Sequence, residues 1–170
     1  VELEPNKYKA FHKLGYCYQK LGSSSSSEII NENNISRRDK NYIESIINFK
    51  KSITVLNYSE NKDVKYLSPY HALGVSFMEM KNYADAVKIL NEVIVKDEKY
   101  FKAYETLGIL HKDASDSKYQ SYHMALDYLQ KAAKIKPNHH VVKFRISQIY
   151  NILADKNKES KNYKSLEMWA

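Results

Sequence analysis

Six histidines and one cysteine are the residues of this 170-residue chain most able to bind a metal or act in catalysis. A metal site needs ligands that converge, as two histidines do at positions i and i+4 of one helix. His139 and His140 are adjacent, so their side chains point about 100° apart on a helix. They suit the start of a helix better than a chelate. We expect neither a metal site nor a cofactor.

A nucleophilic site is not expected either. Cys17 lies two residues after Gly15, where a small residue packs between helices, so the sequence predicts a buried and unreactive thiol. The serine run 23–27 has no adjacent base, and the chain has no glycine-rich phosphate loop. We therefore expect no catalytic residue and no enzyme. One cysteine forms no internal disulfide, which is typical of a reducing, intracellular location in the cytoplasm or nucleus.

The composition restricts the class of protein. Four glycines and three prolines are too few for a β-sandwich or barrel, while 43% hydrophobic residues can form a core. No apolar run approaches the roughly 20 residues that span a bilayer. The net charge is +7, but its lysines are scattered, and only Arg37, Arg38 and Arg145 could contact phosphates or guanines in a bidentate way. A solvated, lysine-rich surface is favoured over a nucleic-acid site.

A pattern of an aromatic residue, Leu-Gly, and a second aromatic residue or histidine occurs three times, with helical spacing. A glycine inside a helix costs about 1 kcal/mol relative to alanine, so its recurrence indicates close approach of a second helix. The three copies are Phe11, Leu14, Gly15, Tyr18; Tyr70, Leu73, Gly74, Phe77; and Tyr104, Leu107, Gly108, His111.

A second pattern follows each copy of the first. It consists of a tyrosine, a small residue, a large apolar residue, and a small or β-branched residue. The small residues would let the neighbouring helix approach, which predicts two antiparallel helices per repeat. Its copies are Tyr42, Ser45, Phe49, Ser52; Tyr83, Ala86, Leu90, Val93; and Tyr122, Ala125, Leu129, Ala132.

These patterns resemble the tetratricopeptide repeat, which has a period of about 34 residues. Gly74 and Gly108 are 34 residues apart, and Pro137 stands where the family has its terminal proline. The resemblance covers nearly the whole chain. It implies an all-α, right-handed α-solenoid of antiparallel helix pairs, with about three repeats and a C-terminal capping helix pair. Residues 1–170 would form one such domain, cut from a longer protein.

Departures from the period predict insertions. Residues 23–40 would form a low-complexity loop inside the first repeat, and shorter insertions fall near residues 60–66 and 114–120. In the last repeat Ser147 replaces the glycine, as in an atypical capping repeat. His111 occupies a core position of the pattern. The expected helices are 7–21, 41–57, 66–81, 83–96, 100–113, 119–135, 139–154 and 159–169.

In such a stack the first helix of each repeat lines the concave side. The stripe of that helix away from its packed face predicts a partner-binding groove with an apolar centre and a polar rim. Ser68 lies on the same stripe. The groove residues that we expect are Lys9, His12, Tyr16, Gln19, His71, Val75, Met78, Lys102, Glu105, Ile109, Lys112 and Phe144.

One branch of the family grips the acidic tails of chaperones with five clamp residues. The equivalent positions here hold His12, Tyr16, Ala72, Lys102 and Thr106, of which only the lysine matches, so this activity is not expected. The resemblance instead implies a scaffold or adaptor that binds a peptide or helix of another protein within a multi-subunit complex. The alternatives are an RNA-binding helical repeat and a non-catalytic recruiting arm of a larger enzyme.

Overall fold

The computed structural model describes residues 7–28, 35–58 and 66–167, with side chains as far as residue 156. Within these residues the chain forms seven α-helices and no extended strand, so the all-α class is confirmed. The helices are α1 (Lys7–Ser24), α2 (Arg37–Tyr58), α3 (Ser68–Glu79), α4 (Tyr83–Lys96), α5 (Phe101–Asp113), α6 (Tyr122–Ile135) and α7 (His140–Glu167).

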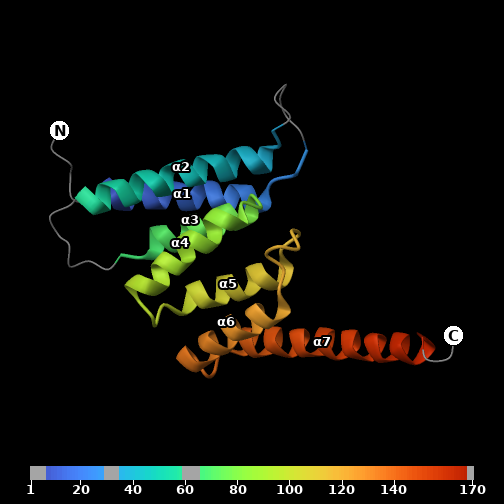
Figure 1. Cartoon of the computed structure of the whole chain (residues 1–170). Coiled ribbons are helices and arrows are strands. Elements are labelled where there is room, and N and C mark those ends of the chain that lie inside the picture. The colour runs from blue at the N-terminus through green and yellow to red at the C-terminus, as the bar shows by residue number, and fades with distance from the viewer. Residues whose placement is uncertain (1–6, 29–34, 59–65, 168–170) are drawn as a thin grey trace. The chain divides into compact units, whose positions relative to one another are not determined.

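The chain divides into two compact units, Val1–Ala103 and Tyr104–Ala170, which are described one at a time. In the first unit α1 packs on α2 and α3, and α3 packs on α2 and α4 (Figure 1). In the second unit α6 packs on α7. Each described pair has the helix-turn-helix character that the repeated patterns predict.

The recurring glycines lie where two helices touch. A Cβ atom placed on any of them would come within 2.6 to 2.8 Å of the large apolar side chain on the following helix, which is closer than real Cβ atoms approach. The prediction of close helix approach is confirmed in all three pairs. The contacts join Gly15 to Phe49, Gly74 to Leu90, and Gly108 to Leu129.

The second helices supply most of the fully buried residues. Every small, large and β-branched position of the second pattern is 0% exposed. This burial of apolar surface against the first helices provides the main driving force for each pair. The residues are Ser45, Phe49, Ser52, Ala86, Leu90, Val93, Ala125, Leu129 and Ala132.

The connection inside the first pair is shorter than the loop expected over residues 23–40. Helix α1 continues to Ser24, and α2 begins at Arg37 instead of residue 41. The side chain of Ser36 explains the early start, because its hydroxyl accepts a hydrogen bond from the Asp39 amide at 3.0 Å, as an N-cap does. Residues 29–34, and most of the insertion expected near residues 60–66, lie outside the described part of the chain.

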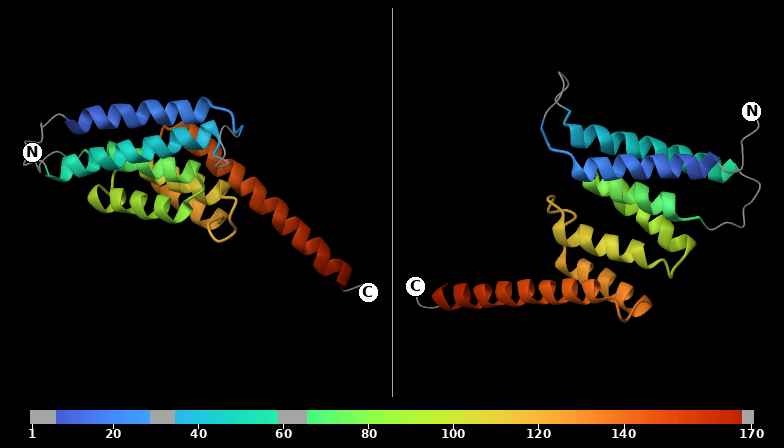
Figure 2. Two further views of the ribbon diagram at one scale, coloured as in Figure 1. Left: turned by 90° about the horizontal axis from the view of Figure 1, so that it is seen from above. Right: turned by 180° about the vertical axis from the view of Figure 1, so that it is seen from behind.

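The C-terminal segment corrects one expectation. The sequence predicted two helices, 139–154 and 159–169, as a capping pair, whereas α7 runs as one helix from His140 to Glu167 (Figure 2). No glycine or proline follows Pro137, so the sequence contains none of the residues that usually end a helix. The expected break between the two helices is therefore wrong.

Candidate functional site

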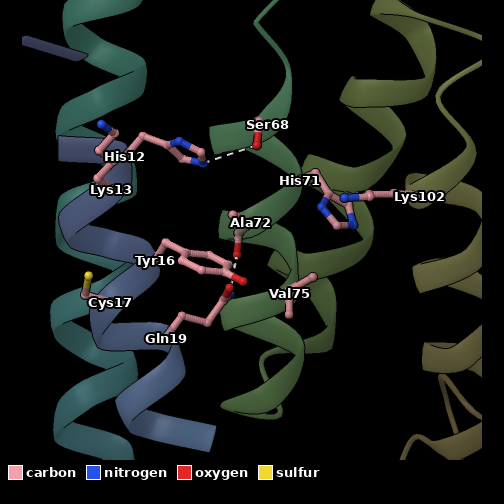
Figure 3. Close-up of a pocket in the computed structure, with 10 residues that line it drawn as sticks. All are labelled: His12, Lys13, Tyr16, Cys17, Gln19, Ser68, His71, Ala72, Val75 and Lys102. Carbon is pink, nitrogen blue, oxygen red and sulfur yellow. Dashed lines mark hydrogen bonds between the residues drawn. The ribbon is translucent and has the colours of Figure 1, made fainter. Parts of the chain in front are cut away.

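A cavity of about 480 Å³ lies in the first unit, between α1 and α3 and beside the start of α5 (Figure 3). Its walls mix aromatic, small apolar and basic side chains, and no carboxylate occurs among the residues described there. The lining residues are His12, Lys13, Tyr16, Cys17, Gln19, Ser68, His71, Ala72, Val75 and Lys102.

Half of the predicted groove residues line this cavity. Those brought together are His12, Tyr16, Gln19, His71, Val75 and Lys102, together with Ser68 of the same stripe. Lys9 and Met78 belong to the same unit but do not line it, and the Lys9 ammonium instead lies 5.7 Å from the centre of the Tyr8 ring.

The other four predicted residues, Glu105, Ile109, Lys112 and Phe144, belong to the second unit. Glu105 and Ile109 are half-buried on α5, where Lys112 also forms an ion pair with Asp113 at 3.2 Å. Phe144 is 62% exposed on α7, which leaves its ring available to a ligand.

Two cavity residues that the sequence analysis missed share one position of the repeat. Lys13 and Ala72 both lie two residues before the glycine of their helix, and both line the cavity. The predicted groove stripe does not include this position of the pattern. Extending it by this one position would have identified both residues.

His12 joins α1 to the beginning of α3. Its Nδ1 lies 2.8 Å from the Tyr66 hydroxyl and its Nε2 lies 3.2 Å from the Ser68 hydroxyl. The Tyr66 ring also packs edge-on against the imidazole, with centres 5.4 Å apart. Burial lowers the pKa of His12 below its usual value. Both ring nitrogens are thus occupied by neighbours within the protein.

His71 forms the opposite wall and is neutral at pH 7. Burial, together with the charge of Lys102, lowers its pKa to about 4, against the opposing effect of a hydrogen bond with the Lys102 backbone. The His71 ring lies 5.8 Å from the ring of Tyr100. Lys13 and Lys102 therefore supply the positive charge of the cavity.

Gln19 is held by two part-buried hydrogen bonds that connect it to buried serine hydroxyls. Its amide donates to the Ala72 carbonyl oxygen and to the Ser76 hydroxyl, both at 2.9 Å. The Ser45 hydroxyl donates to the Tyr42 carbonyl oxygen at 2.7 Å, so Ser76 must be the donor in its 2.8 Å contact with Ser45. Gln19 therefore links α1 to α3 and α2 as well as lining the cavity.

The sequence-based expectation for Cys17 is wrong, because its thiol is free and exposed at the cavity rim. The equivalent residue of the second repeat, Ser76, is fully buried because Gln19 and Ser45 contact it. Within the described residues no neighbour covers Cys17 in that way. The position two residues after the glycine is buried only where another helix packs on it.

His111 has the structural environment that its place in the pattern predicts. It is 4% exposed, its ring stacks on Tyr128 with planes only 3° apart, and its Nδ1 donates to the Tyr119 carbonyl oxygen at 2.7 Å. This bond fixes the connection between α5 and α6. In the described part of the chain, no three His, Cys, Asp or Glu side chains come together as a metal site would require.

None of the described helices is both long and apolar enough to cross a membrane. No family model and no curated protein matches this sequence. Solved structures do match it, at low sequence identity.

Three tetratricopeptide-repeat or related structures illustrate the match. The first TPR of Spaghetti (RPAP3), bound to the HSP90 peptide SRMEEVD, is 15% identical with a TM-score of 0.55, over 84% of this chain and 95% of that one. The C-terminal TPR-containing domain of a Plasmodium falciparum putative FK506-binding protein is 17% identical, with a TM-score of 0.53. The match covers 89% of this chain and 95% of that one. MamA is 18% identical, with a TM-score of 0.54, and the match covers 96% of this chain and 91% of that one.

Each of these structures is similar to the present chain in fold, with a TM-score between 0.53 and 0.55. The likeness concerns the fold, and it agrees with the repeated pattern that the sequence carries independently. The chain therefore has the fold of tetratricopeptide-repeat domains.

Proposed function

We propose that this chain is a non-catalytic protein-interaction module, a scaffold or adaptor that binds an extended segment or helix of a partner protein in the cavity between α1 and α3. The observation that carries the proposal is the cavity itself. Its volume of about 480 Å³ falls within the range of ligand-binding pockets, roughly 300–1,000 Å³.

The cavity walls suit a peptide side chain better than a reactive substrate. The Tyr16 ring is 49% exposed, and the half-buried Val75 lies near it on α3 (Figure 3). Aromatic residues dominate the energetics of protein interfaces because they bury a large rigid surface. Lys13 and Lys102 add donors at the edge. Lys9 and Met78, the remaining predicted groove residues of the same unit, would extend the contact beyond the cavity.

The location that fits this proposal is a reducing one, the cytoplasm or nucleus. Cys17 is an exposed thiol, and such a group persists more readily where glutathione and thioredoxin keep thiols reduced. A multi-subunit complex in such a compartment would supply the partner.

We do not expect a carboxylate clamp of the kind that grips acidic chaperone tails. The Spaghetti domain is bound to the peptide SRMEEVD. In the present chain Ala72 and Thr106, two of the five equivalent positions, are buried and uncharged. The peptide SRMEEVD should therefore show no saturable heat of binding in calorimetry. Saturable binding that disappears in Lys102→Ala would contradict this.

The proposal is tested by selecting peptides from a display library on the wild-type chain and measuring their affinity for variants. Tyr16→Glu should weaken the selected peptides at least tenfold, because a carboxylate replaces the exposed ring at the cavity. Val95→Glu is the matched control, since Val95 is 86% exposed on α4 and does not line the cavity. Peptides whose affinity is the same for wild type and Tyr16→Glu would refute the cavity as the binding site.

A further inference from the structure

Two hydrogen-bonded bridges between α1 and α3 bound the cavity, one at each end (Figure 3). At one end His12 contacts the Ser68 hydroxyl at 3.2 Å, and at the other Gln19 donates to the Ala72 carbonyl oxygen at 2.9 Å. His12 and Gln19 are seven residues apart, which is about 10.5 Å along α1 at about 1.5 Å per residue. A helix with its side chains is about 10–12 Å across. A partner helix therefore does not fit between the bridges, whereas a single side chain does.

The walls between the bridges carry three aromatic rings. His12 and Tyr16 lie on α1, and His71 lies on α3. Burial lowers the pKa of both imidazoles, so both are uncharged at pH 7. The Lys20 ammonium lies 5.4 Å from the centre of the Tyr16 ring, and Tyr16 is still 49% exposed. Uncharged planar rings favour an aromatic occupant, which packs on them offset-stacked or edge-on.

The carboxamide of Gln19 supplies a hydrogen-bond acceptor of fixed orientation. Its Nε2 donates one hydrogen to the Ala72 carbonyl oxygen and the other to the Ser76 hydroxyl, both at 2.9 Å. Because a carbonyl oxygen only accepts, the amide nitrogen must face Ala72, and Oε1 is held on the other side of the amide. No described residue donates to Oε1. An occupant of the cavity with an N–H or O–H group can therefore bind to this oxygen.

We propose that the cavity receives a tryptophan side chain of the partner segment, an inference that rests on the proposed function. The indole ring lies against Tyr16 and Val75, and its N–H donates to Gln19 Oε1. Indole is a donor with no acceptor, which matches a wall whose fixed polar atom is an acceptor. Lys13 and Lys102 favour the same ring, because an ammonium group is attracted to an aromatic face, and most strongly to that of tryptophan.

Other planar groups match the walls less well. A phenylalanine ring would cover Gln19 Oε1 without donating to it, and burial of an acceptor without a partner is unfavourable. Tyrosine has a donor, but its single ring presents a smaller face to the lysines. A nucleobase is recognised through several donors and acceptors on its edge, whereas the carboxamide of Gln19 fixes only one acceptor. Tryptophan satisfies the ring, the acceptor and the lysines together.

Nuclear magnetic resonance tests the proposal with small probes on the complete, isotope-labelled chain. The first probe is N-acetyl-tryptophanamide, and its matched control is the same compound methylated at the indole nitrogen, which keeps the ring but has no donor. We expect the first probe to shift the amide signals of Tyr16, Gln19 and Val75 saturably, and the methylated probe to bind at least fivefold more weakly. N-acetyl-leucinamide should cause no saturable shift. Equal dissociation constants for the first two probes, or shifts elsewhere in the chain, would overturn the proposal.

Gln19→Leu separates loss of the hydrogen bond from the bulk of the added methyl group. The variant has no acceptor, so the ratio between the dissociation constants of the two indole probes should fall below twofold. An unchanged ratio would show that Gln19 does not bind the indole. Tyr16→Ala should weaken both probes alike, at least threefold, and Val95→Glu, at an exposed position of α4, should leave both unchanged. Circular dichroism checks that each variant is folded. If Gln19→Leu does not fold, the comparison of the two probes on wild type decides the proposal alone.

The peptides selected by display distinguish failure of this inference from failure of the proposed function. If both hold, the peptides share a tryptophan, and its replacement by leucine weakens binding at least tenfold. Peptides that lose affinity for Tyr16→Glu but contain no tryptophan would overturn the inference and leave the proposed function standing. Peptides that bind Tyr16→Glu as well as wild type would refute the proposed function itself. Tighter binding of adenosine monophosphate than of N-acetyl-tryptophanamide, at the same amide signals, would assign the cavity to a nucleobase and overturn the inference.

Discussion

Gly108 on α5 and Leu129 on α6 lie so close that a Cβ atom on the glycine would be 2.6 Å from Leu129 Cγ and 3.3 Å from the Ala125 carbonyl oxygen. Leu129 and Ala125 are both fully buried. The glycine is therefore required by its neighbour and has no role in ending a helix, since it lies in the middle of α5. The same relationship recurs in the other two pairs.

Gly108→Ala should lower the free energy of unfolding. The added methyl group overpacks the contact, which costs about 1–3 kcal/mol, and this outweighs the gain in helix propensity of about 1 kcal/mol. Urea denaturation followed by circular dichroism measures the change. In a Leu129→Ala background only the 3.3 Å approach to the Ala125 carbonyl oxygen remains, so the same substitution should cost less stability. A loss of stability that is equal in both backgrounds would show that the contact with Leu129 is not its cause.

Gln19→Leu should destabilise the first unit by about 1–2 kcal/mol, because Ser76 and the Ala72 carbonyl oxygen lose their donor while they remain buried. The partner of a double-mutant cycle is Ser76→Ala. Since the two side chains share a hydrogen bond, the double variant should lose less stability than the two single variants predict together. Additive losses in urea denaturation would show that the bond contributes nothing.

Ser36→Ala should lower the free energy of unfolding by about 1 kcal/mol, the usual effect of removing an N-cap hydroxyl. The loss should appear in thermal unfolding, and as faster amide exchange at the Asp39 amide that Ser36 accepts from. Ser24→Ala is the matched control, because Ser24 is exposed at the last residue of α1. Equal stability of Ser36→Ala and Ser24→Ala would rule out capping by Ser36.

The stability of the chain should fall in acid partly because of His71. Its pKa is about 4 in the folded state and 6.5 in its unperturbed form, so the unfolded state binds more protons between these values. The contribution of neutral His71 is complete above pH 6.5 and decreases as the pH falls towards 4, by about 3 kcal/mol in total. Burial lowers the pKa of His12 as well, which acts in the same direction.

His71→Gln tests this dependence, because glutamine does not titrate. Denaturation midpoints at pH 7 and pH 4.5 should lie closer together for the variant than for the wild type. His123→Gln, at an exposed position on α6, should leave the wild-type dependence unchanged. The same pH dependence in wild type and His71→Gln would exclude His71 as its source.

Much of the fold could be predicted because the pattern of a helix pair occurs three times in the sequence. The three glycines and their large partners are local patterns whose spacing determines which helix faces meet. The start of α2 was missed although its signal was present, since Ser36 stands three residues before Asp39 as a capping residue does. The continuous α7 was missed because the family pattern suggested a break that no residue of the segment causes.

The candidate site was predictable in part, for a related reason. The stripe that contains Tyr16 and Val75 follows from helical periodicity. Half of the groove residues predicted in this way line the cavity. The burial of Cys17 could not be derived in the same way, because it depends on whether another helix covers that face.

The single exposed thiol at the cavity rim makes this chain suitable for fluorescence spectroscopy without further engineering. A maleimide dye would attach at Cys17 alone, since the chain contains no second cysteine to remove. A dye that responds to the polarity of its surroundings would change its emission when a peptide fills the adjacent cavity. Occupancy of that site could then be followed in real time, apart from any event at a more distant surface.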